Sequence, residues 1–422
     1  MSLDGDATAT TSSGSRARPV ELASYEEVKE AFRQKDLKQA LYDQAGVILQ
    51  DALITLHGEE HRVRRRLENR LFRLDTLRGY ELDVVRPSIA ETIEPFMSRG
   101  WLDLVELSRR VTLNLSALIA GVDRPHESVE DTERLLDYVW KFSAGATVAH
   151  AVDKERVAAE AAEALEQYDR EFFQASHARR AELVERFKRG EIEETELPRD
   201  ILTLLLRDQD HLGLPLQTVR RETCGYLQAA TGSTAMAVAN TIDEIFGWLK
   251  SHPEDRPRLD GDLVFVQTCV HETIRLHPAS PIASRRAMAP VRLKAGLDIP
   301  EGAAVVMDLM AANRDRAVFG SDAEEFRPGR PRPEGVPPWG VGFGGGAHSC
   351  IGQILDGGLD PAHMREDPAE RNYGSVALVV QALFQHGVAP HPEREPARDT
   401  TSTRRQWGFY PVVLGHPAGV AS

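Results

Sequence analysis

The chain has 422 residues, of which 41% are hydrophobic and 27% are charged, and its formal net charge is −14. These proportions are ordinary for a globular protein, so collagen-like, fibrous and wholly disordered chains are excluded. The excess of acidic residues argues against a general nucleic-acid or anionic-membrane binder, because phosphate groups attract positively charged surfaces.

The first half of the chain is predicted to be a leader followed by helices. Residues 1–22 are rich in Ser, Thr, Ala and Gly and are expected to form a disordered leader, with a single domain over 23–422. Ser24 is placed to cap a helix that starts at Tyr25. Helical spacing of apolar residues also appears over 58–72, 154–188 and 214–250.

The chain changes character after residue 276. Short β-branched segments bounded by Gly or Pro, at 290–293 and 303–309, predict strands. Pro and Gly crowd residues 327–346, which predicts an irregular loop, and a last helix over 375–385 precedes a hairpin-like tail over 407–414. The predicted fold class is mainly α with small β-sheets (α+β).

Cysteine usage indicates the compartment. Cys224, Cys269 and Cys350 are an odd, sparse set, which is no disulfide framework and indicates a reducing cytoplasm. No apolar run reaches the roughly 18 residues that a membrane span needs, and the N-terminus lacks the apolar core of a signal peptide. We therefore expect a cytoplasmic protein with neither nucleic-acid nor membrane partners.

The strongest motif is the segment GFGGGAHSCIG at residues 342–352. As a dinucleotide fingerprint it would need a preceding strand, but Pro337, Pro338 and Trp339 stand there. As F-x-x-G-x-x-x-C-x-G, its glycines let the backbone approach a bulky flat partner, and N–H groups of the turn can stabilise a thiolate. A buried free cysteine beside a Gly-rich turn is the alternative.

The segment VHETIRLHP at residues 270–278 carries the second motif. It begins like the zinc signature H-E-x-x-H, but Arg275 stands at the second ligand position and cannot bind zinc. What remains is E-x-x-R, in which Glu272 and Arg275 lie one helical turn apart and can pair. Taken alone, an exposed pair worth less than about 1 kcal/mol is the alternative.

Together these motifs resemble the cytochrome P450 superfamily of heme-thiolate oxygenases, over roughly residues 24–415. The resemblance implies a triangular P450-like fold with a long distal helix over the heme and shortened N-terminal elements. Residues 23–422 would be the heme-thiolate catalytic domain. The implied cofactor is heme b, whose iron takes the Cys350 thiolate as axial ligand.

The resemblance also assigns roles around that cofactor. Phe343 would pack near the sulfur, while Gly346 and Gly352 would allow the geometry of the loop. Residues expected to meet the heme propionates are His348, His61 and Arg65 of an H-x-x-x-R helix, and Arg285. Glu272, Arg275 and Arg330, the last from an F-x-x-x-R segment, would hold the cysteine loop without reacting.

The distal helix departs from the family pattern. In that family an acid followed by a threonine usually relays protons there, but neither possible register of the segment AATGSTAMA at residues 229–237 contains a carboxylate. We therefore expect Thr231, Ser233 or Thr234, or the substrate itself, to supply the proton relay. Small residues that serve only helix packing are the alternative.

The resulting functional hypothesis is an oxidoreductase of monooxygenase type. It would oxidise a small, apolar or aromatic natural-product intermediate with O2 and electrons from a ferredoxin and its reductase, docked on a basic cluster. That cluster comprises Arg62, Arg64, Arg66, Arg70 and Arg73, for which a solvated helix face is the alternative. Oxidative C–C or C–N coupling, peroxide-driven oxidation, a non-enzymatic heme-binding protein and a cysteine-nucleophile hydrolase stay open.

Overall fold

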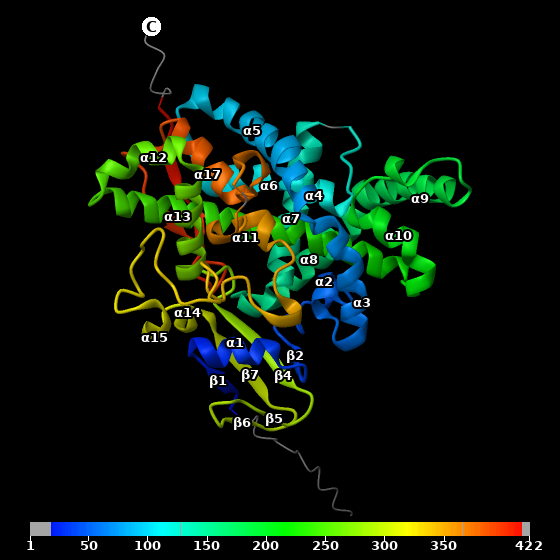
Figure 1. The fold of residues 1–422 in the computed structure, drawn as a ribbon. Helices are drawn as coiled ribbons and strands as arrows, with labels where there is room; N and C mark the ends of the chain where they lie inside the picture. The colour runs from blue at the N-terminus through cyan, green and yellow to red at the C-terminus, as the bar shows by residue number, and fades with distance from the viewer. Residues whose placement is uncertain (1–17, 127, 365, 416–422) are drawn as a thin grey trace, which may run out of the picture.

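The computed structural model describes residues 18–126, 128–364 and 366–415. Figure 1 shows a triangular outline in which helices fill the broad part. The largest sheet occupies the narrow end, with helix α1 (Tyr25–Arg33) lying against it. The predicted fold class, mainly α with small sheets, is confirmed. Most of the predicted leader, residues 1–17, lies outside the described residues.

Helices follow one another through the first half of the chain. After α1 these are α2 (Gly46–Leu49), α3 (Gly58–Glu68), α4 (Leu74–Tyr80), α5 (Arg86–Arg99), α6 (Leu104–Ala120), α7 (Val129–Ala146), α8 (Lys154–Tyr168), α9 (Gln174–Lys188) and α10 (Ile201–Leu212). The predicted Ser24 cap is present, because the Ser24 side chain accepts a hydrogen bond from the Glu27 N–H. A π-helical turn over Asp169–Phe173 joins α8 to α9, so the predicted helix over 154–188 continues without a break.

The second half begins with the longest helix. It contains α11 (Leu216–Leu249), α12 (Arg256–Gly261), α13 (Leu263–Leu276), α14 (Leu309–Ala312), α15 (Arg316–Phe319), α16 (Gln353–Gly357) and α17 (Ser375–Gln385). Helix α11 crosses the middle of the molecule and packs along α6 and α7 (Figure 1). Its buried apolar residues, among them Leu227, Val238 and Ile242, join those of α6, α13 and α17 in one large core.

The largest sheet has the strand order β1-β7-β4-β2. Its strands are β1 (Val20–Leu22), β7 (Ala304–Asp308), β4 (Ile282–Ala287) and β2 (Leu37–Gln39). β1 runs parallel to β7, with Val20 opposite Val305, and the other pairs are antiparallel. The predicted leader boundary is therefore wrong at its end, because residues 20–22 complete this sheet and bury Leu22 in a second apolar core.

Three smaller sheets complete the fold. They pair β5 (Val291–Arg292) with β6 (Asp298–Ile299), β9 (Ala397–Arg398) with β10 (Trp407–Phe409), and β11 (Pro411–Val413) with both β3 (Trp101–Asp103) and β8 (Ala389–Pro390). The predicted hairpin-like tail is wrong in its pairing. β10 and β11 join different sheets, because β11 pairs with strands far away in the sequence.

The chain makes an excursion between α16 and α17, where a break near Gly357 and a restart at Ser375 were predicted. Two glycines with positive φ, Gly358 and Gly374, stand at its ends. A Cβ on Gly374 would lie 2.4 Å from the Asp356 carbonyl oxygen, so the two ends of the excursion meet backbone to backbone. The Gln267 amide of α13 donates to the carbonyls of Gly357 and Leu359 and fixes this crossing.

Candidate active site

A cavity of about 440 Å³ lies between α11 and the glycine-rich cysteine loop. Its walls include α11 around residues 225–237, the loop over 342–352, α3, the end of α7, the segment 277–285 and the C-terminal turn over 399–407. Leu49, Ala52, Ala279 and Trp407 are also among the lining residues. The cavity is therefore assembled from elements that are distant in sequence.

The cysteine loop is shaped by backbone contacts. The Cys350 N–H donates to the Phe343 carbonyl at 2.9 Å, and this bond closes the loop. Gly346 has φ +64°, and a Cβ there would lie 1.9 Å from the carbonyl oxygen of Phe32 in α1. Only glycine fits this position, because its backbone lies directly against α1.

The Cys350 thiol differs from the other two in what surrounds it. Cys224 and Cys269 are buried, whereas the Cys350 side chain faces the cavity. The surrounding protein and nearby Asp356 raise the pKa of Cys350 to about 11, while the Gly352 N–H and Arg65 oppose that rise. The thiol is therefore protonated at neutral pH until a positive partner lowers its pKa.

Four nitrogen-bearing side chains gather at one side of the same cavity. His61 of α3 and His348 of the loop stack with ring centroids 4.1 Å apart. Neither His61 Nε2 nor His348 Nδ1 has a hydrogen-bond partner among the described residues. Burial lowers the pKa of His61 to about 4 and that of His348 to about 3, so both rings are neutral at pH 7.

Arg65 and Arg285 line the cavity beside these histidines. Arg285 is 4% exposed, and its guanidinium donates to the Gln39 side chain at 2.8 Å and to the Ser284 carbonyl. Arg65 bonds to Asn69. Within the described ranges neither arginine has a carboxylate within ion-pair distance. This side of the cavity therefore offers positive charge and N–H donors to an anionic group.

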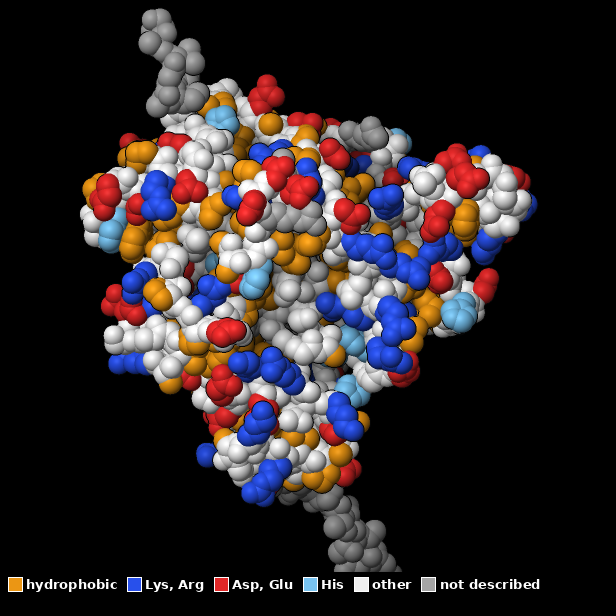
Figure 2. Space-filling model, in the orientation of Figure 1, with side chains coloured by type: hydrophobic (Ala, Val, Ile, Leu, Met, Phe, Trp, Pro, Cys, Tyr) orange, Lys and Arg blue, Asp and Glu red, His pale blue; other side chains and the backbone are white. Residues whose placement is uncertain are grey.

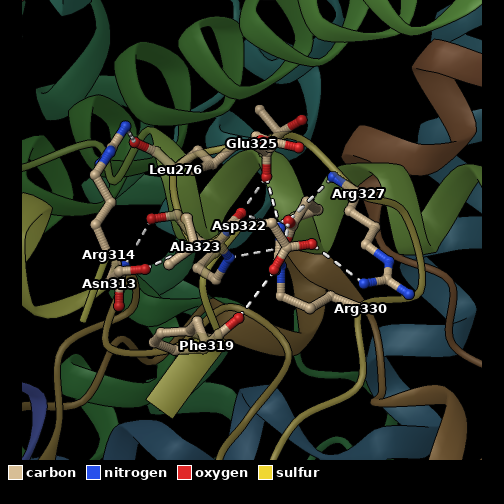
Figure 3. Close-up of polar contacts among 12 residues, drawn as sticks. Leu276, Asn313, Arg314, Phe319, Asp322, Ala323, Glu325, Arg327 and Arg330 are labelled. Atoms are coloured by element: carbon tan, nitrogen blue, oxygen red, sulfur yellow. Dashed lines mark hydrogen bonds and ion pairs between the residues drawn. The ribbon is translucent and has the colours of Figure 1, made fainter. Parts of the chain in front are cut away.

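A buried charge network lies behind the cysteine loop. Arg275 is fully buried and donates twice to the Glu272 carboxylate, at 2.8 and 2.7 Å. Arg330 adds a third bond to Glu272 at 2.9 Å, so the E-x-x-R pair and the predicted third arginine meet. Figure 3 shows Arg330 reaching toward Asp322 and the carbonyls of Phe319 and Glu325.

The same network reaches the loop through Asn313. The Arg275 guanidinium donates to the Asn313 carbonyl at 2.6 Å, and the Asn313 side-chain amide donates back to the Arg275 carbonyl. The Asn313 amide oxygen then accepts from the Val341 N–H, at the start of the glycine-rich segment. The charges of α13 thus position the backbone that leads to Cys350.

The three hydroxyl residues predicted as a relay occupy different environments. Ser233 lines the cavity and donates to the Ala229 carbonyl at 2.6 Å. Thr231 is buried and donates to the Leu227 carbonyl, away from the cavity. Thr234 is also buried and donates to the Asp356 carboxylate at 2.8 Å. The structure therefore brings Ser233 alone of these three to the cavity wall.

Asp356 is a cavity residue that the sequence analysis missed. It lies on α16, six positions after Cys350, and accepts hydrogen bonds from Thr234 of α11 and Ser375 of α17. Desolvation raises its pKa to about 6 against the effect of those two hydroxyls. A polar residue in a short apolar helical turn was the available signal, and it was overlooked because carboxylates were sought only on α11.

Comparison with known proteins decides the family. The family model described as cytochrome P450 matches residues 7–355. The chain belongs to the cytochrome P450 family. The match ends just beyond the cysteine loop, so it includes the E-x-x-R network and most of the cavity wall.

Individual P450 relatives are distant. A monooxygenase named FPY7 from Fusarium mangiferae is 29% identical over 187 residues, which cover 39% of this chain and 36% of that protein. Putative cytochrome P450 137 from Mycobacterium tuberculosis is 27% identical over 209 residues, covering 47% and 39% of the two chains. The matched segments thus span little more than a third of these relatives' lengths.

Solved P450 structures share the fold over nearly the whole chain. CalO2 superposes with a TM-score of 0.70 at 17% identity, covering 93% of this chain and 90% of its own. P450BioI, solved in complex with a fatty-acid-ligated acyl carrier protein, gives a TM-score of 0.69 at 18% identity and covers 93% and 92%.

The residues of the cavity fit the heme that the P450 family implies. A heme carries two carboxylates, and the orphaned nitrogens of His61 and His348 lie with Arg65 and Arg285 where carboxylates are needed. A coordinating metal lowers the pKa of a thiol and deprotonates it. A bound iron would therefore counteract the surroundings that raise the pKa of Cys350. Cys350, Phe343, Gly352 and the four donors all line the cavity that would hold the group.

The surface near α3 carries exposed arginines. Figure 2 shows Lys and Arg side chains gathered over α3 and α10, on the right of the view. Arg62, Arg66, Arg70 and Arg73 are exposed, but the prediction that Arg64 belongs to this cluster is wrong. Arg64 is 2% exposed and pairs with Glu68 and Glu222, because it faces α11. Within the described ranges no helix is both long and apolar enough to cross a bilayer.

The E-x-x-R network gives a stability prediction. We expect Arg275→Ala to lower the free energy of unfolding by about 3–5 kcal/mol, because it leaves the buried Glu272 charge with one guanidinium fewer. Arg327→Ala is the matched control, since Arg327 forms an exposed pair with Asp322 worth less than about 1 kcal/mol. Denaturant unfolding measures both, and equal losses would contradict the assigned role of the network.

Asp356 gives a pH prediction. Because its pKa is raised from 3.8 to about 6, its contribution to stability is complete below pH 3.8 and is lost as pH rises through 6. We therefore expect Asp356→Asn to match the natural protein near pH 4 and to exceed its unfolding free energy near pH 8, by on the order of 3 kcal/mol. Unfolding curves at both pH values measure this, and a constant difference between the proteins would refute it.

Proposed function

We propose that the protein is a heme-thiolate monooxygenase that oxidises a small, apolar or aromatic natural-product intermediate, using O2 and electrons from a ferredoxin and its reductase. The observation that carries the proposal is Cys350 facing a cavity that is also lined by four nitrogen-bearing side chains without carboxylate partners among the described residues. When bound, a thiolate-ligated heme b supplies the chemistry, because the thiolate pushes electron density to the iron and favours O–O cleavage.

The proposal gives each side chain a role. Cys350 would hold the heme iron through its thiolate, and Phe343, Gly346 and Gly352 would shape the loop around its sulfur. His348, His61, Arg65 and Arg285 bind the two propionates, which would neutralise the two guanidinium charges there. Glu272, Arg275 and Arg330 position the loop and do not touch the reacting atoms.

Proton delivery is assigned to Ser233. It is the hydroxyl of the three candidates that lines the cavity, so it can hold an ordered water or a substrate hydroxyl there. Thr231 and Thr234 are assigned to packing, since their hydroxyls bond to Leu227 and Asp356. Because the lining residues of α11 between 229 and 237 include no acid, oxidative C–C or C–N coupling is the second candidate reaction.

The ferredoxin is proposed to dock on the exposed arginines of α3 and the turn after it. Arg62, Arg66, Arg70 and Arg73 would attract an acidic partner, whereas the chain as a whole carries −14. The proposal includes a cytoplasmic location, which the three free cysteines support.

A cysteine-nucleophile hydrolase fits the site less well. Catalytic cysteines have lowered pKa values or an adjacent base that makes them nucleophilic. The surroundings of Cys350 raise its pKa to about 11 instead. A positive metal partner accounts for such a thiol, while a hydrolytic role does not.

Replacing the ligand tests the proposal. We expect reduced, carbon monoxide-treated protein to show the red-shifted Soret band of thiolate ligation, and Cys350→Ser to lose it, because a hydroxyl does not replace the thiolate ligand. Cys224→Ala and Cys269→Ala are the matched controls, since both thiols are buried and absent from the cavity wall. An unchanged band in Cys350→Ser would refute the proposed heme-thiolate function.

The proton assignment has its own test. We expect Ser233→Ala to lower the yield of product per electron consumed by about tenfold or more, because it removes the cavity-facing hydroxyl. Thr231→Ala is the control and should keep the natural yield. The yield is measured with a substrate found by screening extracts of the producing organism. Equal yields from Ser233→Ala and the natural protein would remove Ser233 from the relay.

A further inference from the structure

Charged and polar side chains line the cavity beyond those proposed to bind the propionates. Arg404, Arg109, His150 and Trp407 all line it, and each has a side-chain nitrogen with no hydrogen-bond partner among the described residues. The unpartnered atoms are Arg404 Nε, Arg109 Nε, His150 Nε2 and Trp407 Nε1. The proposed cofactor needs none of these four residues.

Arg404 stands where three walls of the cavity meet. Its guanidinium contacts the Ala279 carbonyl at 3.4 Å and the Thr147 hydroxyl at 3.3 Å, which are long hydrogen bonds. Across the described ranges no carboxylate lies within ion-pair distance of it. Its charge is therefore held by two weak neutral contacts, and its buried Nε–H has no partner among the described residues.

The turn that carries Arg404 is fixed in place. The Thr403 N–H donates to the His150 carbonyl at 2.8 Å, and the Val152 N–H donates to the Thr401 carbonyl at 3.2 Å. An isolated bridge pairs Ala151 with Ser402 between these bonds. The turn over 399–406 is thus joined to the segment after α7, which sets the direction of the Arg404 side chain.

The nearby Asp399 carboxylate is hydrogen-bonded to neutral groups and forms no ion pair with Arg404 among the described residues. Asp399 lines the cavity, but its Oδ1 accepts from the N–H and hydroxyl of Thr401, and its Oδ2 accepts from Gln406 at 2.6 Å. The guanidinium of Arg109 lies 3.6 Å from the ring centre of Trp140 and also lacks an ion-pair partner in the described part of the chain. Asp103 and Asp399 both act on the charge of Arg109, whereas Arg404 has Asp399 as its nearby carboxylate and, in the described part of the chain, no carboxylate at ion-pair distance.

Arg404 is half-buried with its Nε shielded from water, which is costly for a guanidinium because part of its hydration is lost and no carboxylate replaces it at ion-pair distance in the described part of the chain. A ligand that carries an anionic group would supply the opposite charge that this guanidinium lacks. Guanidinium N–H groups match a carboxylate in geometry and bind it with two parallel bonds. Trp140, Trp407 and the small apolar residues of α11 leave room beside it for an apolar or aromatic body.

We propose that the substrate is an organic acid whose carboxylate is bound by Arg404, with its apolar or aromatic body lying along the tryptophans toward Cys350. The inference rests on the proposed function and adds the substrate class to it. Arg109 contributes long-range positive charge, and His150 and Trp407 offer N–H donors to the same anion.

Matched ligand pairs test the carboxylate site. Calorimetry on the heme-loaded protein compares phenylacetate with phenylacetamide, indoleacetate with indoleacetamide, and decanoate with decanamide. Each pair differs in charge and little in shape. We expect at least one acid to bind about tenfold more tightly than its amide, because only the acid pairs with the guanidinium.

Three variants of the turn assign that preference to one side chain. Arg404→Gln should abolish the preference, whereas Arg404→Lys should restore part of it by returning the charge. Arg405→Gln is the matched control, since Arg405 is exposed and does not line the cavity, and it should leave the preference unchanged. The red-shifted carbon monoxide band is recorded for every variant to show that the cofactor pocket is intact.

The outcomes separate the two proposals. A natural protein that lacks the red-shifted band refutes the proposed function. A natural protein with the band in which every acid binds like its amide, or in which no ligand of any pair binds, refutes the carboxylate site alone. An acid preference that survives Arg404→Gln with the band intact also refutes it.

Discussion

The Glu272 carboxylate accepts hydrogen bonds from two buried guanidinium groups, and the rest of the site depends on this contact. Arg275 comes from the same helix and Arg330 from the irregular chain before the cysteine loop. Each guanidinium also binds backbone carbonyls of the segment 313–325. This segment, in which turns flank the short helix α15, thereby gains fixed partners, and through Asn313 it fixes the start of the loop that presents Cys350.

The cavity in front of that loop has two cationic regions with different assignments. One consists of Arg65 and Arg285 with His61 and His348, and its charge matches two carboxylates of the proposed cofactor. The other consists of Arg404 and Arg109 beside Asp399, and these residues come from the C-terminal turn and α6. Two sets of positive side chains in one protein interior require two anionic partners, because unpaired buried charge is unfavourable. The cofactor proposal and the substrate proposal therefore depend on the same constraint, that a charge removed from water needs a partner of opposite sign.

Sequence spacing predicted the parts of the site that local chemistry determines. The bounds of α17 followed from a strongly apolar run beginning at Ser375, and the glycines and cysteine of the loop have fixed separations along the chain. The positions of Thr231 and Thr234 could not be read in this way, because which face of α11 meets the cavity depends on how α11 packs against α6 and α16. Arg64 was misplaced for the same reason, since an arginine in a basic run gives no sign that Glu222, 158 positions away on α11, joins Glu68 in pairing with it. Arg404 lies in a turn whose contacts with the segment after α7 span about 250 positions of chain, which no local pattern encodes.

The two ends of the excursion between α16 and α17 lie against each other, and this contact affects how the excursion tolerates insertions and deletions. The Leu359 N–H donates to the Asn372 carbonyl at 2.9 Å, and Gly358 and Gly374 bring the entering and leaving strands of chain into direct contact. The intervening residues therefore start and finish at one point of the scaffold. Adding residues to a loop whose ends are held together changes the free energy of folding little, since the entropic cost of closing a loop grows only slowly with its length. Insertions and deletions within 360–371 should leave α16, α17 and the thiolate pocket undisturbed, which makes this detour a natural place for the molecule to vary its outer surface.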